Sequence, residues 1–225
     1  MFIGHYGVAL GLKKADGSIS LGLLFIAVQL NDLIWPVLIL LGIEKVAIVP
    51  GITRANPMDF VYYPFSHSLG ASLLWALLTA GIALILPLPA KLNKRRLAVV
   101  LGVAVLSHYL LDLVVHRPDL PLLGGDSYKL GLGLWNHVAV SYTLETAIFL
   151  AGLWIYLKAT AGRDKVGKYG VPLFAFVLVI FNLINLFAVP PDNSKMIASS
   201  TLIVLPLLAL VAFWLDRHRA PAQKP

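Results

Sequence analysis

Residues 97–116 read LAVVLGVAVLSHYLLDLVVH, an apolar run in which His108, Asp112 and His116 stand four positions apart. A bilayer core about 30 Å thick needs roughly 20 residues of apolar helix to cross it. The run therefore predicts a transmembrane helix that carries three ionisable side chains on one face. Because such side chains are costly inside a membrane, they indicate a functional site.

The composition of the whole chain supports a membrane environment. Of 225 residues, 59% are hydrophobic and only 13% are charged, whereas soluble domains carry about 25% charged residues. This excludes an ordinary soluble domain, a disordered chain and a nucleic-acid-binding protein, since the net charge of +7 comes from short basic clusters between apolar runs. The chain has no cysteine, which excludes disulfides, thiolate catalysis and cysteine-bound zinc.

The apolar runs predict an all-α integral membrane protein with six transmembrane helices. Their expected ranges are 19–43, 67–89, 97–116, 137–157, 170–190 and 196–215. A shorter apolar piece, residues 2–12, reaches only about 16 Å as a helix, so we expect a half-helix. We expect residues 1–219 to form a single helical bundle domain and residues 220–225 to be a disordered tail.

The basic residues predict an orientation. Thirteen of the 18 lie on one side of the six-span arrangement. The positive-inside rule then places both termini in the cytoplasm of a bacterial-type cytoplasmic membrane. The loops 44–66 and 117–136 face outward.

Several ionisable residues fall at a common depth in this arrangement. Asp32, His108 and Glu145 each lie roughly 12–17 Å below the outer ends of their helices, near the bilayer midplane. A half-helix that leaves the membrane at Lys13 would bring His5 to the same level, and His67, His116 and His137 would surround the mouth above. We therefore predict one polar cavity that opens outward.

The spacing of His108, Asp112 and His116 suits metal binding. Two ligands four residues apart on a helix can hold one ion, but the outer two are about 12 Å apart along the axis, too far for a single ion. Either one metal takes His108 and Asp112, with His116 outside its ligand set, or Asp112 bridges two ions. Histidine and carboxylate ligands favour a divalent metal, first zinc, with manganese and iron as alternatives.

The remaining polar residues receive catalytic and substrate-binding roles. A carboxylate near a metal-bound water can accept its proton, so Glu145 and Asp32 are the candidate bases, and His116 is the third catalytic candidate. At the mouth, Arg117 could attract an anionic head group, or it could only pair with Asp119. We assign Asn136 and His137 there to substrate binding as well.

Several short motifs in the first 120 residues resemble predicted membrane-bound metal-dependent hydrolases, which are distantly similar to zinc-dependent phospholipases C. These motifs are His5, Asp32, Ser66-His67-Ser68 and His108-x3-Asp112. The resemblance implies that His5, Asp32 and His67 join His108 and Asp112 as metal ligands, and that the substrate is a lipid or a phosphoester.

The sequence departs from this family at two places. Leu33 and Ile34 follow Asp32 where the family has a second aspartate, and Tyr62-Tyr63 replaces a His-Arg pair. A closer similarity is to bacterial integral membrane proteins that carry no known activity. It rests on Tyr63-Pro64-Phe65-Ser66-His67-Ser68, His116-Arg117-Pro118-Asp119 and Gly131-Leu132-Gly133-Leu134-Trp135-Asn136.

Three functions agree with this sequence. We expect a metal-dependent hydrolase that acts on a small molecule or on the membrane lipids around it. A proton- or metal-coupled transporter is the first alternative, because histidines and carboxylates inside membranes also relay protons. The second is a non-catalytic membrane scaffold whose polar residues only join helices.

Overall fold

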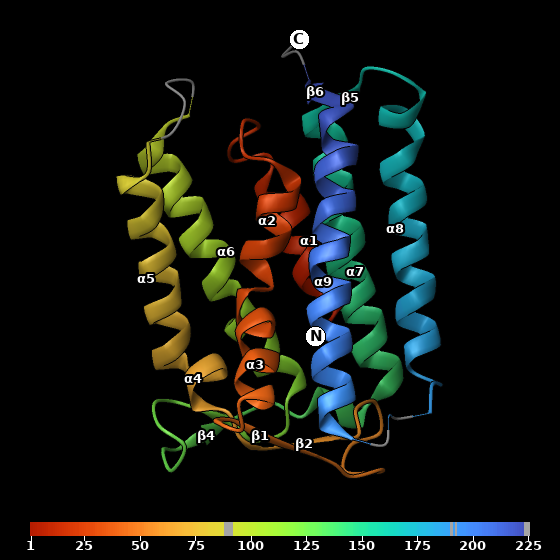
Figure 1. The fold of residues 1–225 in the computed structure, drawn as a ribbon. Coiled ribbons are helices and arrows are strands. Elements are labelled where there is room, and N and C mark those ends of the chain that lie inside the picture. The colour runs from red at the N-terminus through yellow and green to blue at the C-terminus, as the bar shows by residue number, and fades with distance from the viewer. Residues whose placement is uncertain (88–91, 190, 192, 223–225) are drawn as a thin grey trace.

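The computed structural model describes residues 1–87, 92–189, 191 and 193–222 as a bundle of helices with short strands at its ends (Figure 1). The helices are α1 (Ile3–Leu12), α2 (Leu21–Val28), α3 (Leu30–Leu40), α4 (Pro64–His67), α5 (Leu69–Ile85), α6 (Lys94–Val115), α7 (Val138–Ala159), α8 (Lys165–Asn185) and α9 (Ser194–Arg217). The strands are β1 (Lys45–Ile48), β2 (Met58–Tyr62), β3 (Leu120–Pro121), β4 (Lys129–Leu130), β5 (Thr160–Gly162) and β6 (Arg219–Pro221), and Leu134–Asn136 forms a 3-10 turn.

The all-α prediction is confirmed, and so is the presence of helices that can cross a membrane. Within the described residues, α6, α7, α8 and α9 are each long and apolar enough for a span. The pair α2 and α3 adds a fifth if its two bent halves count as one. Helix α5 is apolar but has 17 residues. The structure therefore provides four to five spans by length and composition, where six were expected.

The first expected span, residues 19–43, is not a continuous helix. It is broken at Gln29, whose backbone leaves the helical conformation, and the two halves meet at 54°. The break frees the carbonyl oxygen of Val28, which accepts a hydrogen bond from Nδ1 of His108 at 2.8 Å. Just beyond it, Asn31 donates to Ser66 O at 2.7 Å and to Ser72 Oγ at 2.8 Å. A polar side chain of α6 thus satisfies backbone that the break exposes, and Asn31 ties the start of α3 to α4 and α5.

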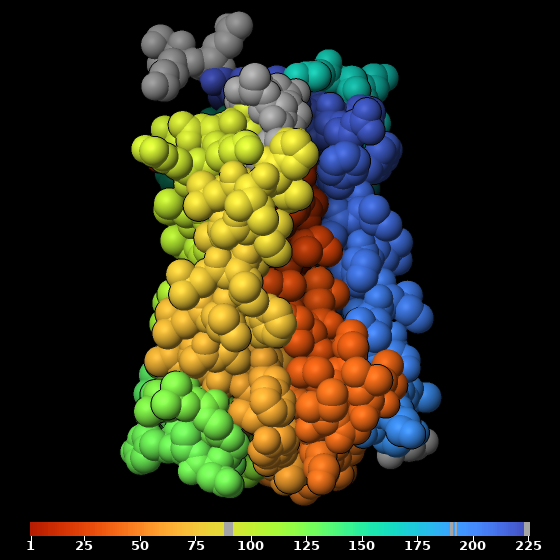
Figure 2. Space-filling view, turned by 60° about the vertical axis from the view of Figure 1, so that its left-hand side comes forward, coloured from red at the N-terminus to blue at the C-terminus, as the bar shows by residue number. Residues whose placement is uncertain are grey.

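Helices α1 and α2 lie inside the bundle, in contact with each other and with α6. On the face shown in Figure 2, the α2–α3 pair lies between α5 and α9. Helix α1 begins at mid-height of the bundle (Figure 1) and packs closely on α7 through two glycines. A Cβ atom on Gly7 would lie 2.6 Å from Ile148 O, and one on Gly152 would lie 1.9 Å from Gly7 O. This contact fixes the position of α1, and with it the position of His5, inside the bundle.

The strands cover the two ends of the bundle. Antiparallel pairs β1–β2 and β3–β4 lie at one end, which we call the hairpin end, and β5–β6 lies at the other (Figure 1). Ala220 and Pro221, the first residues of the tail expected to be disordered, pair with β5 and so belong to the folded unit. Residues 223–225 of that tail lie outside the described residues.

Candidate metal centre

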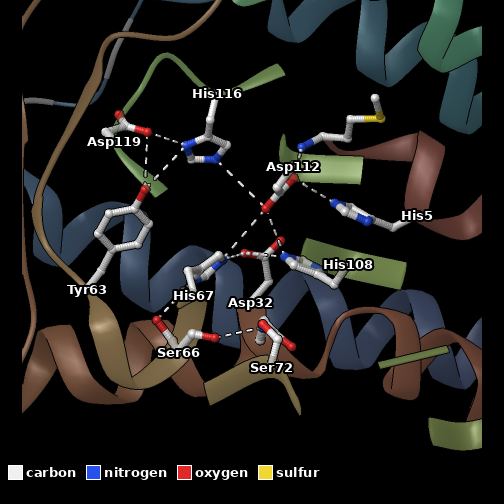
Figure 3. A network of polar contacts seen from close by, with 12 residues as sticks. His5, Asp32, Tyr63, Ser66, His67, Ser72, His108, Asp112, His116 and Asp119 are labelled. Carbon is white, nitrogen blue, oxygen red and sulfur yellow. Dashed lines mark hydrogen bonds and ion pairs between the residues drawn. The ribbon is translucent and has the colours of Figure 1, made fainter. Parts of the chain in front are cut away.

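Six ionisable side chains from four helices meet inside the bundle (Figure 3). His5 comes from α1, Asp32 from α3, and His67 from the end of α4. Helix α6 contributes His108 and Asp112, and His116 caps its end. We call these six residues the His/Asp cluster. All except Asp32 are buried.

Asp112 is the centre of the His/Asp cluster (Figure 3). Its Oδ2 atom faces Nε2 of His108 at 3.1 Å, of His116 at 3.8 Å and of His67 at 3.9 Å. Its Oδ1 atom lies 3.2 Å from Nε2 of His5 and 2.5 Å from the amino group of Met1. One carboxylate therefore contacts side chains from three separate segments of the chain.

Asp32 approaches the same histidines from the opposite side. Its Oδ1 atom lies 3.2 Å from Nε2 of His67 and 3.7 Å from Nε2 of His108. The side chain of Asp32 is 28% exposed, whereas that of Asp112 is 4% exposed. Asp32 is therefore the carboxylate of the cluster that solvent can reach.

In two of the histidines, Nδ1 faces an oxygen that accepts its proton. Nδ1 of His108 faces the carbonyl oxygen of Val28, which can only accept. Nδ1 of His67 lies 2.8 Å from Ser66 Oγ, whose own proton goes to Glu44 Oε2 at 2.6 Å. Glu44 is fixed in turn by the backbone amides of Phe65 and Ser66. With Nδ1 protonated, a neutral histidine carries its lone pair on Nε2, where it can bind a metal, whereas a second proton on Nε2 donates to the carboxylates.

His116 is oriented in the same way by a carboxylate. Its Nδ1 atom lies 2.9 Å from Asp119 Oδ1, which also accepts from the hydroxyl of Tyr63 at 3.2 Å. Burial, and then the charge of Asp119, raises the pKa of Tyr63, so its phenol stays protonated as a donor. A carboxylate on the far nitrogen of a histidine is a common second partner of metal-binding histidines.

The donor set fits a divalent metal. Two overlapping groups, His5–Asp32–His108 and His67–His108–Asp112, each place three ligand atoms within 4.8 Å of one another. Ligands at about 2 Å from a tetrahedral ion lie roughly 3.3 Å apart, so these groups need only small movements to close on an ion. Among the described residues, the buried Nε2 of His108 and Nδ1 of His5 have no hydrogen-bond partner. Because an unpaired buried polar atom is costly, a ligand for His108 Nε2 would remove that cost.

Glu145 lies beside the cluster, but hydrogen bonds engage both of its carboxylate oxygens. Oε1 accepts from the backbone amides of Phe2 and Gly4 at the start of α1. Oε2 accepts from the side-chain amide of Asn182 at 3.1 Å. Glu145 therefore anchors the half-helix that carries His5, and Asp32 is the better placed of the two expected bases.

A cavity of about 560 Å³ leads from the cluster toward α8 and α9. Asp32, His67, Asp112 and His116 line its inner end. Trp135 lines it as well and packs on the ring of His116, with 4.2 Å between ring centroids. The sequence suggested an outward cavity, and this one lies at the hairpin end of the cluster.

None of the three residues assigned to substrate binding is part of the lining of this cavity. Asn136 and His137 are exposed, and neither lines it. Arg117 forms ion pairs with Asp59 and with Asp119, the latter at 3.0 Å. The structure therefore favours the pairing interpretation of Arg117, because its charge is already balanced by two carboxylates.

Sequence reasoning missed the residues that support the histidines. Glu44, Tyr63 and Asp119 were not candidates, although Ser66 stands next to His67 in one of the quoted motifs. The sequence did offer a signal for two of these contacts. Ser66 directly precedes His67, and Asp119 stands three positions after His116. Comparison with protein-family models, curated proteins and solved structures finds no match to this chain.

Proposed function

We propose that this protein is a membrane-embedded metal-dependent hydrolase that acts on a lipid or another phosphoester. One observation carries the proposal: His67, His108 and His116 each turn Nε2 toward Asp112, while their Nδ1 atoms are held by Ser66, Val28 and Asp119. Such second partners fix the tautomer and raise the basicity of metal-binding histidines. In this arrangement each neutral histidine offers Nε2 as a ligand atom beside the same carboxylate.

The residues divide into ligands and a base. His5, His67, His108 and Asp112 would hold the ion, with His116 at the outer side of the cluster. A bound divalent metal, with zinc as the first choice, lowers the pKa of its water toward neutrality. Asp32 faces the cavity and the histidines together, so it would accept the proton of that water or complete the ligand set.

The membrane arrangement in this proposal has six spans, with α5 and the bent α2–α3 pair each crossing once. The basic residues then place the C-terminus and the Lys13 end of α1 in the cytoplasm, and the hairpin end outside. A bacterial-type cytoplasmic membrane is the proposed location. The family proposed is that of the membrane-bound metal-dependent hydrolases, on the motifs around His5, Asp32, His67 and His108.

Metal analysis of the purified protein tests the proposal. We expect at least one equivalent of zinc, manganese or iron after purification or rebinding, and its loss in His108→Ala and Asp112→Ala. The control is His218→Ala, which removes a histidine that is paired with Asp164 at the other end of the bundle. Less than about a tenth of an equivalent in the wild-type protein would contradict the proposal. An anomalous-scattering map would locate the ion beside His108 and Asp112.

A transporter is the second candidate, because the span α2–α3 is broken next to Asp32. Broken helices in transporters carry ion sites at their unwound backbone. Flux of protons or metal ions into proteoliposomes, lost on Asp32→Asn, would favour this candidate over the hydrolase.

A further inference from the structure

The cavity beside the His/Asp cluster has a mixed lining. Charged side chains of the cluster and neutral polar side chains, including Tyr142, Asn182 and Thr201, form one part of its wall. Apolar side chains form the other part, and they include Phe181 of α8, Leu186 just beyond it, and Ile197, Val204 and Leu205 of α9. A ligand that fills it needs a polar head and a hydrocarbon part.

The cavity is covered on the side that faces water at the hairpin end. Residues 55–57 between β1 and β2, and Met58 at the start of β2, line it together with Trp135. The amide of Ala55 donates to the carbonyl oxygen of Trp135 at 3.0 Å, which joins the two covering loops. A ligand in the cavity therefore contacts these two loops, and not water, at the hairpin end.

The wall of the cavity formed by α8 and α9 is not covered by such loops in the described residues. Helix α8 packs mainly on α9 and β5 and only lightly on α7. Large apolar side chains cover the outer faces of both helices, among them Phe176 and Ile184 on α8 and Ile203 and Leu207 on α9. Because both helices are long and apolar enough to span a membrane, this side of the cavity would face lipid in the proposed membrane arrangement.

We propose that the space between α8 and α9 receives one hydrocarbon chain of a membrane lipid whose phosphoester head lies at the His/Asp cluster. The inference rests on the proposed function and narrows its substrate class to phospholipids taken directly from the bilayer. The neutral polar side chains of the lining would contact the head group, and Val204 and Leu205 would contact the chain.

Photolabelling tests this inference. The protein is placed in nanodiscs of phosphatidylglycerol and phosphatidylethanolamine with a trace of phospholipid that carries a diazirine in one acyl chain, and labelled residues are mapped by mass spectrometry. We expect label on Leu205, which is only 6% exposed, in addition to the exposed residues that any surrounding lipid labels. Label confined to exposed residues such as Ile203 would overturn the inference.

Two variants on neighbouring positions sharpen the test. Val204→Trp places a large ring in the cavity and should lower labelling of Leu205 at least fivefold, while Ile203→Trp, on the exposed face of the same turn, should leave it unchanged. Equal labelling in both variants would overturn the inference, and the wild-type map decides the question if Val204→Trp does not fold.

Metal content measured on the same samples separates the two proposals. Metal present with Leu205 unlabelled contradicts only the lipid inference. Leu205 labelled in a protein that binds no metal contradicts the hydrolase, and the chain site then stands without it.

Discussion

Two regions of this molecule bury charged side chains, and they do so in opposite ways. At the end with β5 and β6, Nζ of Lys13 donates to Asp216 Oδ2 at 2.6 Å and to the carbonyl oxygen of Ile19 at 2.7 Å. The carboxylate of Asp216 also accepts from the amide of Leu21 and from the hydroxyl of Tyr156. This group, which we call the Lys13–Asp216 lock, is complete within the protein.

The His/Asp cluster is not complete in this sense. It brings four histidines and two carboxylates together, and Nε2 of His108 and Nδ1 of His5 have no partner among the described residues. Buried polar groups are normally satisfied, so a region in which each charged group has protein partners indicates a structural role. A region that leaves buried ring nitrogens without a partner indicates a ligand. The following predictions test this difference, from the largest expected effect to the smallest.

Asp216→Asn should cause the largest loss of stability. Removing one partner of a buried ion pair costs about 3–5 kcal/mol, because the other charge is left without compensation. We expect a lower thermal midpoint in detergent, with metal content per folded molecule unchanged. The double variant Lys13→Met/Asp216→Leu should recover much of the loss. A change in metal content at unchanged stability would contradict the assignment of the lock.

Gly7→Ala should affect both regions, because α1 joins the cluster at His5 to the lock at Lys13. The added methyl group would meet the backbone of α7 at Ile148, and overpacking of this kind costs about 1–3 kcal/mol. We expect both the thermal midpoint and the metal affinity to fall. The matched control is Gly81→Ala in α5, where an added Cβ meets nothing within 4 Å. Equal thermal midpoints and equal metal affinities of the two variants would contradict the close contact between α1 and α7.

Ser66→Ala should weaken the His/Asp cluster alone. Without this hydroxyl, Nδ1 of His67 loses its acceptor, and loss of such a partner typically lowers metal affinity about 10- to 100-fold. Titration with zinc and a competing chelator measures the effect. Ser107→Ala is the control, since its hydroxyl bonds only to Ala104 O in its own helix. The interpretation fails if both variants bind zinc like the wild type.

Arg117→Gln should have the smallest effect. The side chain is 34% exposed, and ion pairs in such positions contribute about 1 kcal/mol or less. We expect a small change in thermal midpoint that salt reduces further, with metal binding intact. A more than tenfold fall in activity on a phosphoester would instead restore the substrate-binding role that the sequence suggested.

The two regions also differ in how far the sequence predicted them. The spacing of His108 and Asp112 on one helix face, and a common depth for Asp32 and His5, were available from the sequence. The lock was not: Lys13 was read only as one of the basic residues that mark the cytoplasmic side. In the structure it is buried against Asp216, 203 positions later in the chain.

The sequence by itself determined that the chain suits a membrane environment, that it is helical, and which residue types are available for chemistry. These follow from composition and from the length of apolar runs, which are local properties of the chain. The break at Gln29 and the close approach of His67 and His116 to Asp112 depend on packing between segments far apart in sequence. The same holds for Glu145, whose carboxylate accepts from an amide 143 positions away and so supports the start of α1. Only the tertiary structure decides which polar groups meet, because each buried donor takes whichever acceptor the packed helices bring to it.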